Sequence, residues 1–137
     1  MAYTLKYNRT LGIVELAYTG RYTAQESRES TAKAIALGKE HGDADALVDA
    51  TEAEVAVSII DLLDLPDRQY VAQGMNRRIR LAVVSPRLPK DHKDAKFYET
   101  ACLNRGWNVR LFTSRDDAIE WLTRTDSSNK PDAGDGK

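Results

Sequence analysis

Residues 46–58 read ALVDATEAEVAVS, and this stretch decides the fold class. Residues 46–48 form a short apolar run, which is typical of a strand buried on both faces of a parallel sheet. Asp49 follows at the expected end of that strand, and Ser58 stands nine positions later, in front of a helical pattern. The stretch therefore predicts an α/β fold. It leaves two interpretations of its polar residues open: a phosphoryl site, or a strand end followed by a helix cap.

The residues before this stretch predict a hairpin and a helix. Tyr3, Leu5 and Tyr7 alternate with polar residues, which is the period of a half-buried strand, and a second strand is expected over residues 13–20. The turn between these strands is so short that they must be antiparallel. Thr23 lies three residues before a glutamate, a capping-box spacing that predicts the start of the first helix.

The residues after Ser58 predict further parallel strands alternating with helices. A short helical turn is expected directly after Ser58, and a second helix is expected to begin at Pro66, because proline forbids a simple continuation. Residues 85–94 contain two prolines and a cluster of charges, which predicts a loop. Later helices are expected around Ala101 and after Ser114, and the remaining strands over residues 78–84 and 109–112. The result is an α/β fold with a single-layer mixed β-sheet, made of an N-terminal antiparallel hairpin and parallel strands, and about four helices.

The chain length and composition suit one globular domain. The sequence has 137 residues, of which 42% are hydrophobic and 30% charged. We expect the domain to span residues 1–124, because residues 125–137 contain one apolar side chain and predict a disordered tail. The sequence predicts neither a signal peptide nor a membrane span, and its single cysteine fits a reducing environment, so a cytoplasmic location is expected.

The charge balance argues against two classes of partner. Lys and Arg together number 20 and Asp and Glu number 21, for a net charge of -1. Proteins that bind nucleic acid or a membrane surface normally carry a basic excess. One local basic concentration, Arg78, Arg80 and Arg87, has two interpretations: a site for an anion, or a charged strand edge that discourages edge-to-edge pairing.

The sequence predicts no catalytic residue set, no metal site and no cofactor. A receiver-type phospho-aspartate site at Asp49 would need an acidic pair at the end of the first strand, and that strand ends in Asn8-Arg9 instead. The two histidines and the one cysteine are far apart in the sequence, and their spacing does not match that of known metal-binding motifs. The candidate nucleophiles and bases, which form no motif, are Ser58, Ser85, Cys102, His41 and His92. An enzyme that uses Asp49 with one of the histidines is the alternative left open.

The helical pattern after Ser58 is unusually apolar and allows two interpretations. Ile59, Leu62 and Leu63 either belong to the core or, together with Asp49, form a groove for a lipophilic ligand or a partner. Residues 96–122 read KFYETACLNRGWNVRLFTSRDDAIEWL, which places a helix, a strand and a last helix in a distinctive order. With YTGRYT at 18–23, LVDAT at 47–51 and RIRLAVV at 78–84, nearly the whole ordered chain resembles the SpoIIAA-like group of STAS-like domains of bacteria.

The resemblance implies a mixed sheet with about four helices, as in anti-sigma-factor antagonists. In those proteins a serine at the start of the helix after the third strand is phosphorylated, and Ser58 occupies a comparable position. The antagonist pattern has an aspartate before this serine and small residues after it, whereas here Val57 precedes Ser58 and Ile59 follows it. Similarity of the fold to Sec14-type lipid-transfer domains implies a groove for an apolar ligand instead.

These observations predict a non-enzymatic regulatory or binding module. Its partner is expected to be either an unknown protein or a small apolar ligand. Ser58 is the candidate phosphoacceptor, and the candidate groove holds Asp49, Ile59, Leu62 and Leu63. The first strand is expected to leave an uncovered edge, which is compatible with a homodimer.

Overall fold

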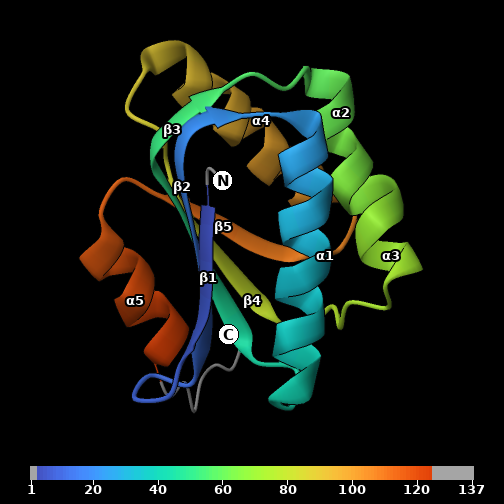
Figure 1. Cartoon of the computed structure of the whole chain (residues 1–137), viewed down its shortest axis with the longest axis vertical. Coiled ribbons are helices and arrows are strands. Elements are labelled where there is room, and N and C mark those ends of the chain that lie inside the picture. Colours follow the sequence, from blue (N-terminus) through green and yellow to red (C-terminus); the bar gives the residue numbers. More distant parts are fainter. Residues whose placement is uncertain (1–2, 125–137) are drawn as a thin grey trace.

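The computed structural model describes residues 3–124, which form one five-stranded sheet with helices on both faces (Figure 1). The strands lie in the order β1-β2-β3-β4-β5; the first pair is antiparallel and all the others are parallel. Their bounds are β1 Tyr3–Asn8, β2 Ile13–Tyr22, β3 Asp45–Val55, β4 Arg80–Val84 and β5 Asn108–Phe112. The predicted fold class is therefore confirmed. The tail predicted over residues 125–137 lies outside the described residues.

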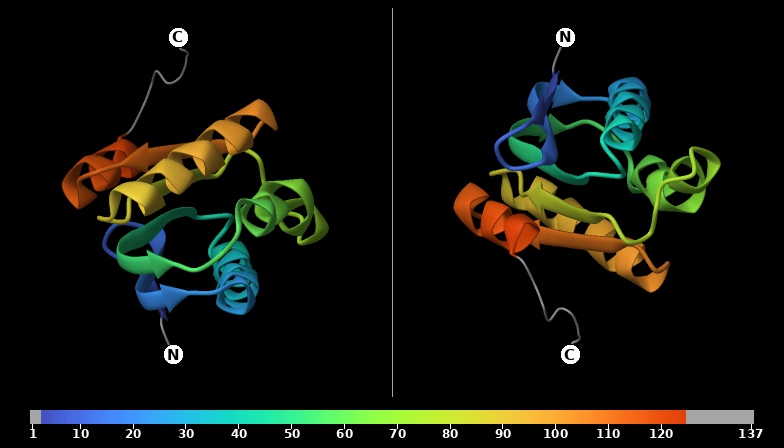
Figure 2. Two further views of the ribbon diagram at one scale, coloured as in Figure 1. Left: turned by 90° about the horizontal axis from the view of Figure 1, so that it is seen from above. Right: turned by 90° about the horizontal axis from the view of Figure 1, so that it is seen from below.

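The helices divide unequally between the two faces of the sheet. In chain order they are α1 Ala24–Glu40, α2 Ile59–Asp64, the π-helical turn Leu65–Gln69, α3 Tyr70–Ala72, α4 Pro89–Asn104 and α5 Arg115–Thr123. Figure 1 shows α5 on the side of the sheet opposite to α1, and Figure 2 shows the helical segment 59–72 between α1 and α4. The core consequently has an α5 side and a larger side beneath the other helices.

The alternation of side chains along the central strands creates these two cores. Ala82 and Val84 of β4 pack with Ala118 and Leu122 of α5. The neighbours Leu81 and Val83 point the other way and pack with Tyr98, Cys102 and Trp107. Successive residues of a strand face opposite sides, so both faces of β4 are apolar because both are covered.

The predicted helix caps are confirmed. The hydroxyl of Thr23 accepts a hydrogen bond from the backbone N–H of Glu26 at 3.3 Å, and Ser114 accepts one from Asp117 at 3.3 Å. Each cap satisfies a backbone donor that the first helical turn leaves without a partner. These local signals fixed where α1 and α5 begin.

The prediction that a new helix starts at Pro66 is wrong. The helical segment runs from Ile59 to Ala72 without a break and passes Pro66 as a π-helical turn. Pro66 has no N–H to donate to the carbonyl of Leu62, and the N–H of Leu65 donates to that carbonyl instead. The N–H of Tyr70 donates to the carbonyl of Leu65, which widens the turn. The chain thus accommodates the proline inside one helical segment.

The loop predicted over residues 85–94 is also shorter than expected. Helix α4 already begins at Pro89, where a proline at the first helical position costs no hydrogen bond. On this helix Phe97 is exposed, and the residues that face the core are Tyr98, Ala101 and Cys102. Strand β4 begins at Arg80, so Arg78 precedes the strand. The prediction that β3 ends at Asp49 is wrong, because the strand continues to Val55 and its second half pairs with the end of β2.

Candidate ligand-binding cavity

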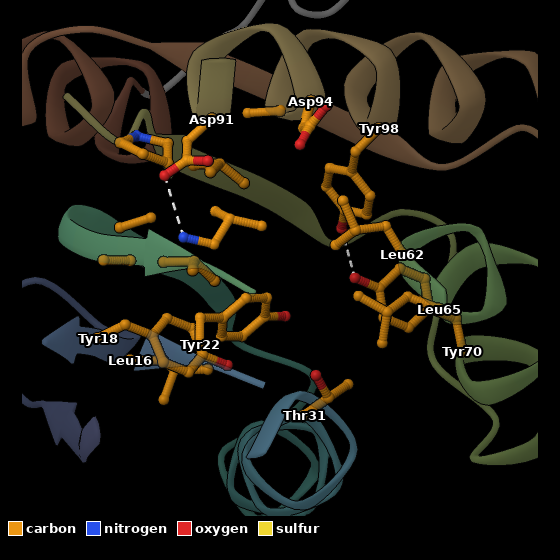
Figure 3. A pocket seen from close by; sticks show the side chains of 17 residues that line it. Leu16, Tyr18, Tyr22, Thr31, Leu62, Leu65, Tyr70, Asp91, Asp94 and Tyr98 are labelled. Atoms are coloured by element: carbon orange, nitrogen blue, oxygen red, sulfur yellow. Dashed lines mark hydrogen bonds between the residues drawn. The ribbon is translucent and has the colours of Figure 1, made fainter. Parts of the chain in front are cut away.

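A cavity lies between the sheet, α1, the helical segment 59–72 and α4 (Figure 3). The volume in which the centre of a water-sized molecule can lie is about 90 Å³. A single water needs roughly 10–15 Å³ by this measure, so the space is large enough for a small organic molecule. The sheet contributes Leu16, Tyr18, Tyr22, Val48, Ala50, Ala53, Val55 and Val83, and the helices contribute Thr31, Leu62, Leu65, Tyr70, Asp91, Asp94, Ala95 and Tyr98.

The cavity wall is apolar because its tyrosine hydroxyls bond to one another or to serines. The Tyr18 hydroxyl forms a hydrogen bond with Ser30, and the Tyr22 hydroxyl donates to Ser27 at 2.6 Å. On the opposite wall the hydroxyls of Tyr70 and Tyr98 are 2.5 Å apart (Figure 3). Burial raises the pKa of all four tyrosines, so their hydroxyls stay neutral. A molecule inside the cavity therefore meets mainly carbon.

Two carboxylates stand at one end of the cavity, and both already have partners. Asp91 is only 3% exposed and accepts a hydrogen bond from the backbone N–H of Val55 at 3.0 Å. The Lys90 ammonium lies 3.6 Å from a carboxylate oxygen of Asp91 and 3.6 Å from one of Asp94. The Lys90 ammonium consequently neutralises one of the two negative charges, and the Val55 N–H stabilises the Asp91 carboxylate.

The four residues expected to form one groove lie in different surroundings. Leu62 lines the cavity, whereas Ile59 and Leu63 are absent from its lining. Asp49 lies on the α5 side of the sheet, where its carboxylate accepts hydrogen bonds from the N–H of Thr51 at 3.0 Å and from the Thr51 hydroxyl at 2.5 Å. Its other oxygen is 3.6 Å from the Arg115 guanidinium. Asp49 thus connects the middle of β3 to the start of α5.

Ser58, the candidate phosphoacceptor, is exposed at the start of α2. Its hydroxyl accepts a hydrogen bond from the N–H of Asp61 at 3.1 Å, which is the geometry of a helix cap. The same short helix carries Leu62 over the cavity. A change at Ser58 would therefore act on an element that covers the cavity.

The three arginines predicted to form an anion site lie at opposite ends of β4. Arg80 is at the beginning of the strand, 3.6 Å from the Asp45 carboxylate, and it donates to the carbonyl of Trp121 at 2.7 Å. Arg87 follows the end of the strand and forms an ion pair with Glu52 at 2.7 Å. Arg78 is exposed ahead of the strand. The fold does not bring these side chains together.

Ser85 and His92 lie closer together than the sequence indicated. The Ser85 hydroxyl is 2.6 Å from Nδ1 of His92, in an open cleft that Thr51 and Thr113 also line. The pair forms because Ser85 directly follows β4 and His92 lies in the first turn of α4. This strand-to-helix spacing was the signal available in the sequence. The other histidine, His41, stacks on Tyr7 with ring centroids 3.6 Å apart. In residues 3–124 neither histidine bonds to Asp49.

The remaining reactive group, the Cys102 thiol, is part of the core. It is fully buried, and burial raises its pKa to about 12. A thiol at such a pKa is almost entirely protonated at neutral pH and reacts slowly. Within residues 3–124 no cluster of three or more His, Cys, Asp or Glu side chains could hold a metal ion. The described helices also include none long and apolar enough to cross a membrane.

Comparison with known proteins identifies the fold. No family model matches the chain, and no curated protein matches it. A solved structure that is similar belongs to an uncharacterized protein of the DUF3478 family with a SpoIIAA-like fold, from Shewanella loihica PV-4. The similarity covers 88% of this chain and 92% of that one, with a TM-score of 0.55 and 16% sequence identity. Together with the five-stranded mixed sheet, it shows that this chain has the SpoIIAA-like, or STAS-like, fold that the sequence predicts.

Proposed function

We propose that this protein is a non-enzymatic binding module and that it holds a small apolar molecule in the cavity between the sheet and α1, α4 and the helical segment 59–72. The observation that carries the proposal is the apolar wall of this cavity, in which the hydroxyls of Tyr18, Tyr22, Tyr70 and Tyr98 already have partners.

The chemistry of the wall favours an apolar guest over water. A buried water needs two to four polar partners, and an apolar wall with paired hydroxyls offers few. An apolar molecule that leaves bulk water for this space gains free energy in proportion to the apolar surface that it buries. A cavity of this kind is also the usual form of a small-molecule site.

The test is a titration with 1-octanol, a neutral probe, followed by NMR of the methyl groups of Leu62 and Val83. We expect saturable shifts of these signals. Replacing Ala95, which lines the cavity, by Phe should weaken octanol binding at least tenfold, because the new ring fills the space. Ala36 is exposed on α1, so Ala36→Phe is the matched control and should bind like the unmodified protein. Absence of saturable shifts in the unmodified protein would contradict the proposal.

The non-enzymatic part of the proposal has a separate test. Among the described side chains, Ser85 and His92 form a hydrogen-bonded pair in which serine could act as a nucleophile and histidine as its base. We expect no covalent modification of Ser85 by a fluorophosphonate probe, as measured by intact-protein mass spectrometry. Labelling that disappears in both Ser85→Ala and His92→Ala would mark the protein as an enzyme instead.

Regulation through Ser58 is a second candidate function, favoured by the exposure of Ser58 on the helix that covers the cavity. A phosphate at this position would add roughly two negative charges at the start of α2. Incubation with a bacterial lysate and ATP should then add one phosphate to the protein, and Ser58→Ala should not be modified. A protein that keeps an unmodified Ser58 under these conditions, or a phosphate that persists in Ser58→Ala, contradicts this function.

A further inference from the structure

A second cavity adjoins the first one beneath α1. It lies between the C-terminal half of α1 and the sheet, and it offers about 70 Å³ by the same measure. Ala34, Ile35, Ala46, Met75 and Leu81 are among its apolar lining residues. The two cavities share Leu16, Thr31, Val48 and Tyr70 as lining residues. The two cavities are therefore adjacent, and these four residues, of which Thr31 and Tyr70 are labelled in Figure 3, form the boundary between them, called the neck below.

The ends of the two cavities differ in charge. At the end of the first cavity Lys90 pairs with both Asp91 and Asp94, so these three side chains carry a net charge of −1. At the end of the second cavity stands Lys39, whose ammonium donates to the carbonyl of Gly74 at 2.9 Å. In residues 3–124 no carboxylate oxygen lies within ion-pair distance of this ammonium; Asp43, which also lines the second cavity, is hydrogen-bonded by Asn76 at 3.3 Å.

An ammonium group has three donors, and one hydrogen bond to Gly74 leaves two of them for a ligand. Because Lys39 stands at the entrance of an apolar space, an anionic group at the end of an apolar chain would find a charge partner there. A cationic group would find a weaker site at the acidic end. Both carboxylates there already pair with Lys90, and Asp91 also accepts a hydrogen bond from the N–H of Val55.

We infer that the ligand is a linear monocarboxylate whose carboxylate lies at Lys39 and whose chain passes through the second cavity and the neck into the first. This inference rests on the proposed function and specifies its ligand. From Lys39 to Thr31 the helix axis advances about 12 Å, so a chain of about ten carbons reaches the first cavity. Each methylene that enters the apolar space should raise the affinity about fourfold.

The experiment compares three ligands with the same ten-carbon chain, below their micelle concentrations, by calorimetry at neutral pH. Decanoate should bind about tenfold more tightly than decanol, and decylamine should bind most weakly. Butyrate should bind at least tenfold more weakly than decanoate, because its chain ends before the neck. Decylamine binding as tightly as decanoate would overturn the inference but not the proposed function, whereas no binding of any ten-carbon ligand would overturn both.

Substitutions locate the carboxylate and the chain. Lys39→Gln should lower decanoate affinity about tenfold and bring the ratio of decanoate to decanol affinity close to one. Lys33→Gln is the matched control, since Lys33 is on the same helix and forms an ion pair with Glu29 at 3.3 Å. Ala34→Leu narrows the second cavity and should weaken decanoate, whereas the exposed Ala36→Leu should not. Thermal unfolding verifies that each variant is folded. An unchanged ligand preference in folded Lys39→Gln would place the carboxylate elsewhere and overturn the inference.

Discussion

Leu47→Ala should lower the free energy of unfolding by about 3–4 kcal/mol, the range for a large-to-small substitution in a closed core. Leu47 is 0% exposed in the first half of β3, where it packs with Ile13, Ala82 and Ala118. This cluster belongs to the α5 side of the sheet, away from both cavities. The lost methyl groups leave a hole that rigid strands on both sides cannot close. Urea unfolding followed by circular dichroism measures the effect.

A substitution of an exposed leucine tests whether the effect of Leu47→Ala comes from burial. Leu103 is 54% exposed at the end of α4, so Leu103→Ala should change the free energy of unfolding by less than about 0.5 kcal/mol. Equal effects of the two substitutions would mean that Leu47 is not a closed core position. Because Leu47 faces away from the cavities, octanol affinity should stay the same in folded Leu47→Ala.

Arg115→Met should cost about 2 kcal/mol at pH 7, within the range for a hydrogen bond to a charged group. The Arg115 guanidinium donates to Glu15 at 2.8 Å, and Glu15 is only 9% exposed. Removal of this partner leaves Glu15 with the amide of Asn8, which donates at 2.7 Å. The guanidinium is itself 43% exposed and therefore partly screened by water, which keeps the effect well below that of a fully buried ion pair.

The cost of Arg115→Met should depend on pH in a defined direction. Burial by itself would raise the pKa of Glu15, but hydrogen bonds from Arg115 and Asn8 outweigh burial and hold this pKa below its usual value. A group whose folded pKa is lowered stabilises the protein above its unfolded pKa, and this contribution is lost as the pH falls through the folded pKa. The difference between the variant and the unmodified protein should shrink below about pH 4.5.

Controls for this pH dependence are available in the same chain. Arg110 is exposed on β5, and Arg110→Met should unfold like the unmodified protein at every pH. Glu15→Gln should remove most of the acid-dependent part of the loss, so that the costs of Arg115→Met at pH 4 and pH 7 differ much less when Gln replaces Glu15. A constant difference in the presence of Glu15 would show that this carboxylate is not the titrating group.

Some features of the fold and the site could be predicted from the sequence, and others could not. Periodicity identified the strands, and capping residues located the starts of α1 and α5, because these signals depend on neighbours within a few positions. The cavity could be anticipated only as an apolar wall after Ser58, of which Leu62 proved to be part. Its other walls come from Tyr18, Tyr98 and Ala95, which are far apart in sequence and individually resemble ordinary core residues.

The stretch ALVDATEAEVAVS shows the difference between what the sequence predicts and what the tertiary structure adds. By itself it determined a buried parallel strand and a helix cap at Ser58, since apolar runs and caps are local properties of the chain, whereas the strand end that it predicted at Asp49 was wrong. Only the tertiary structure decided that Asp49 pairs with Arg115 on the α5 side, while the chain after Ser58 continues through Pro66 and closes over a cavity on the other side. The physical reason is that successive strand residues face opposite sides of the sheet, and whether a face is filled or hollow depends on helices that approach it from distant parts of the sequence.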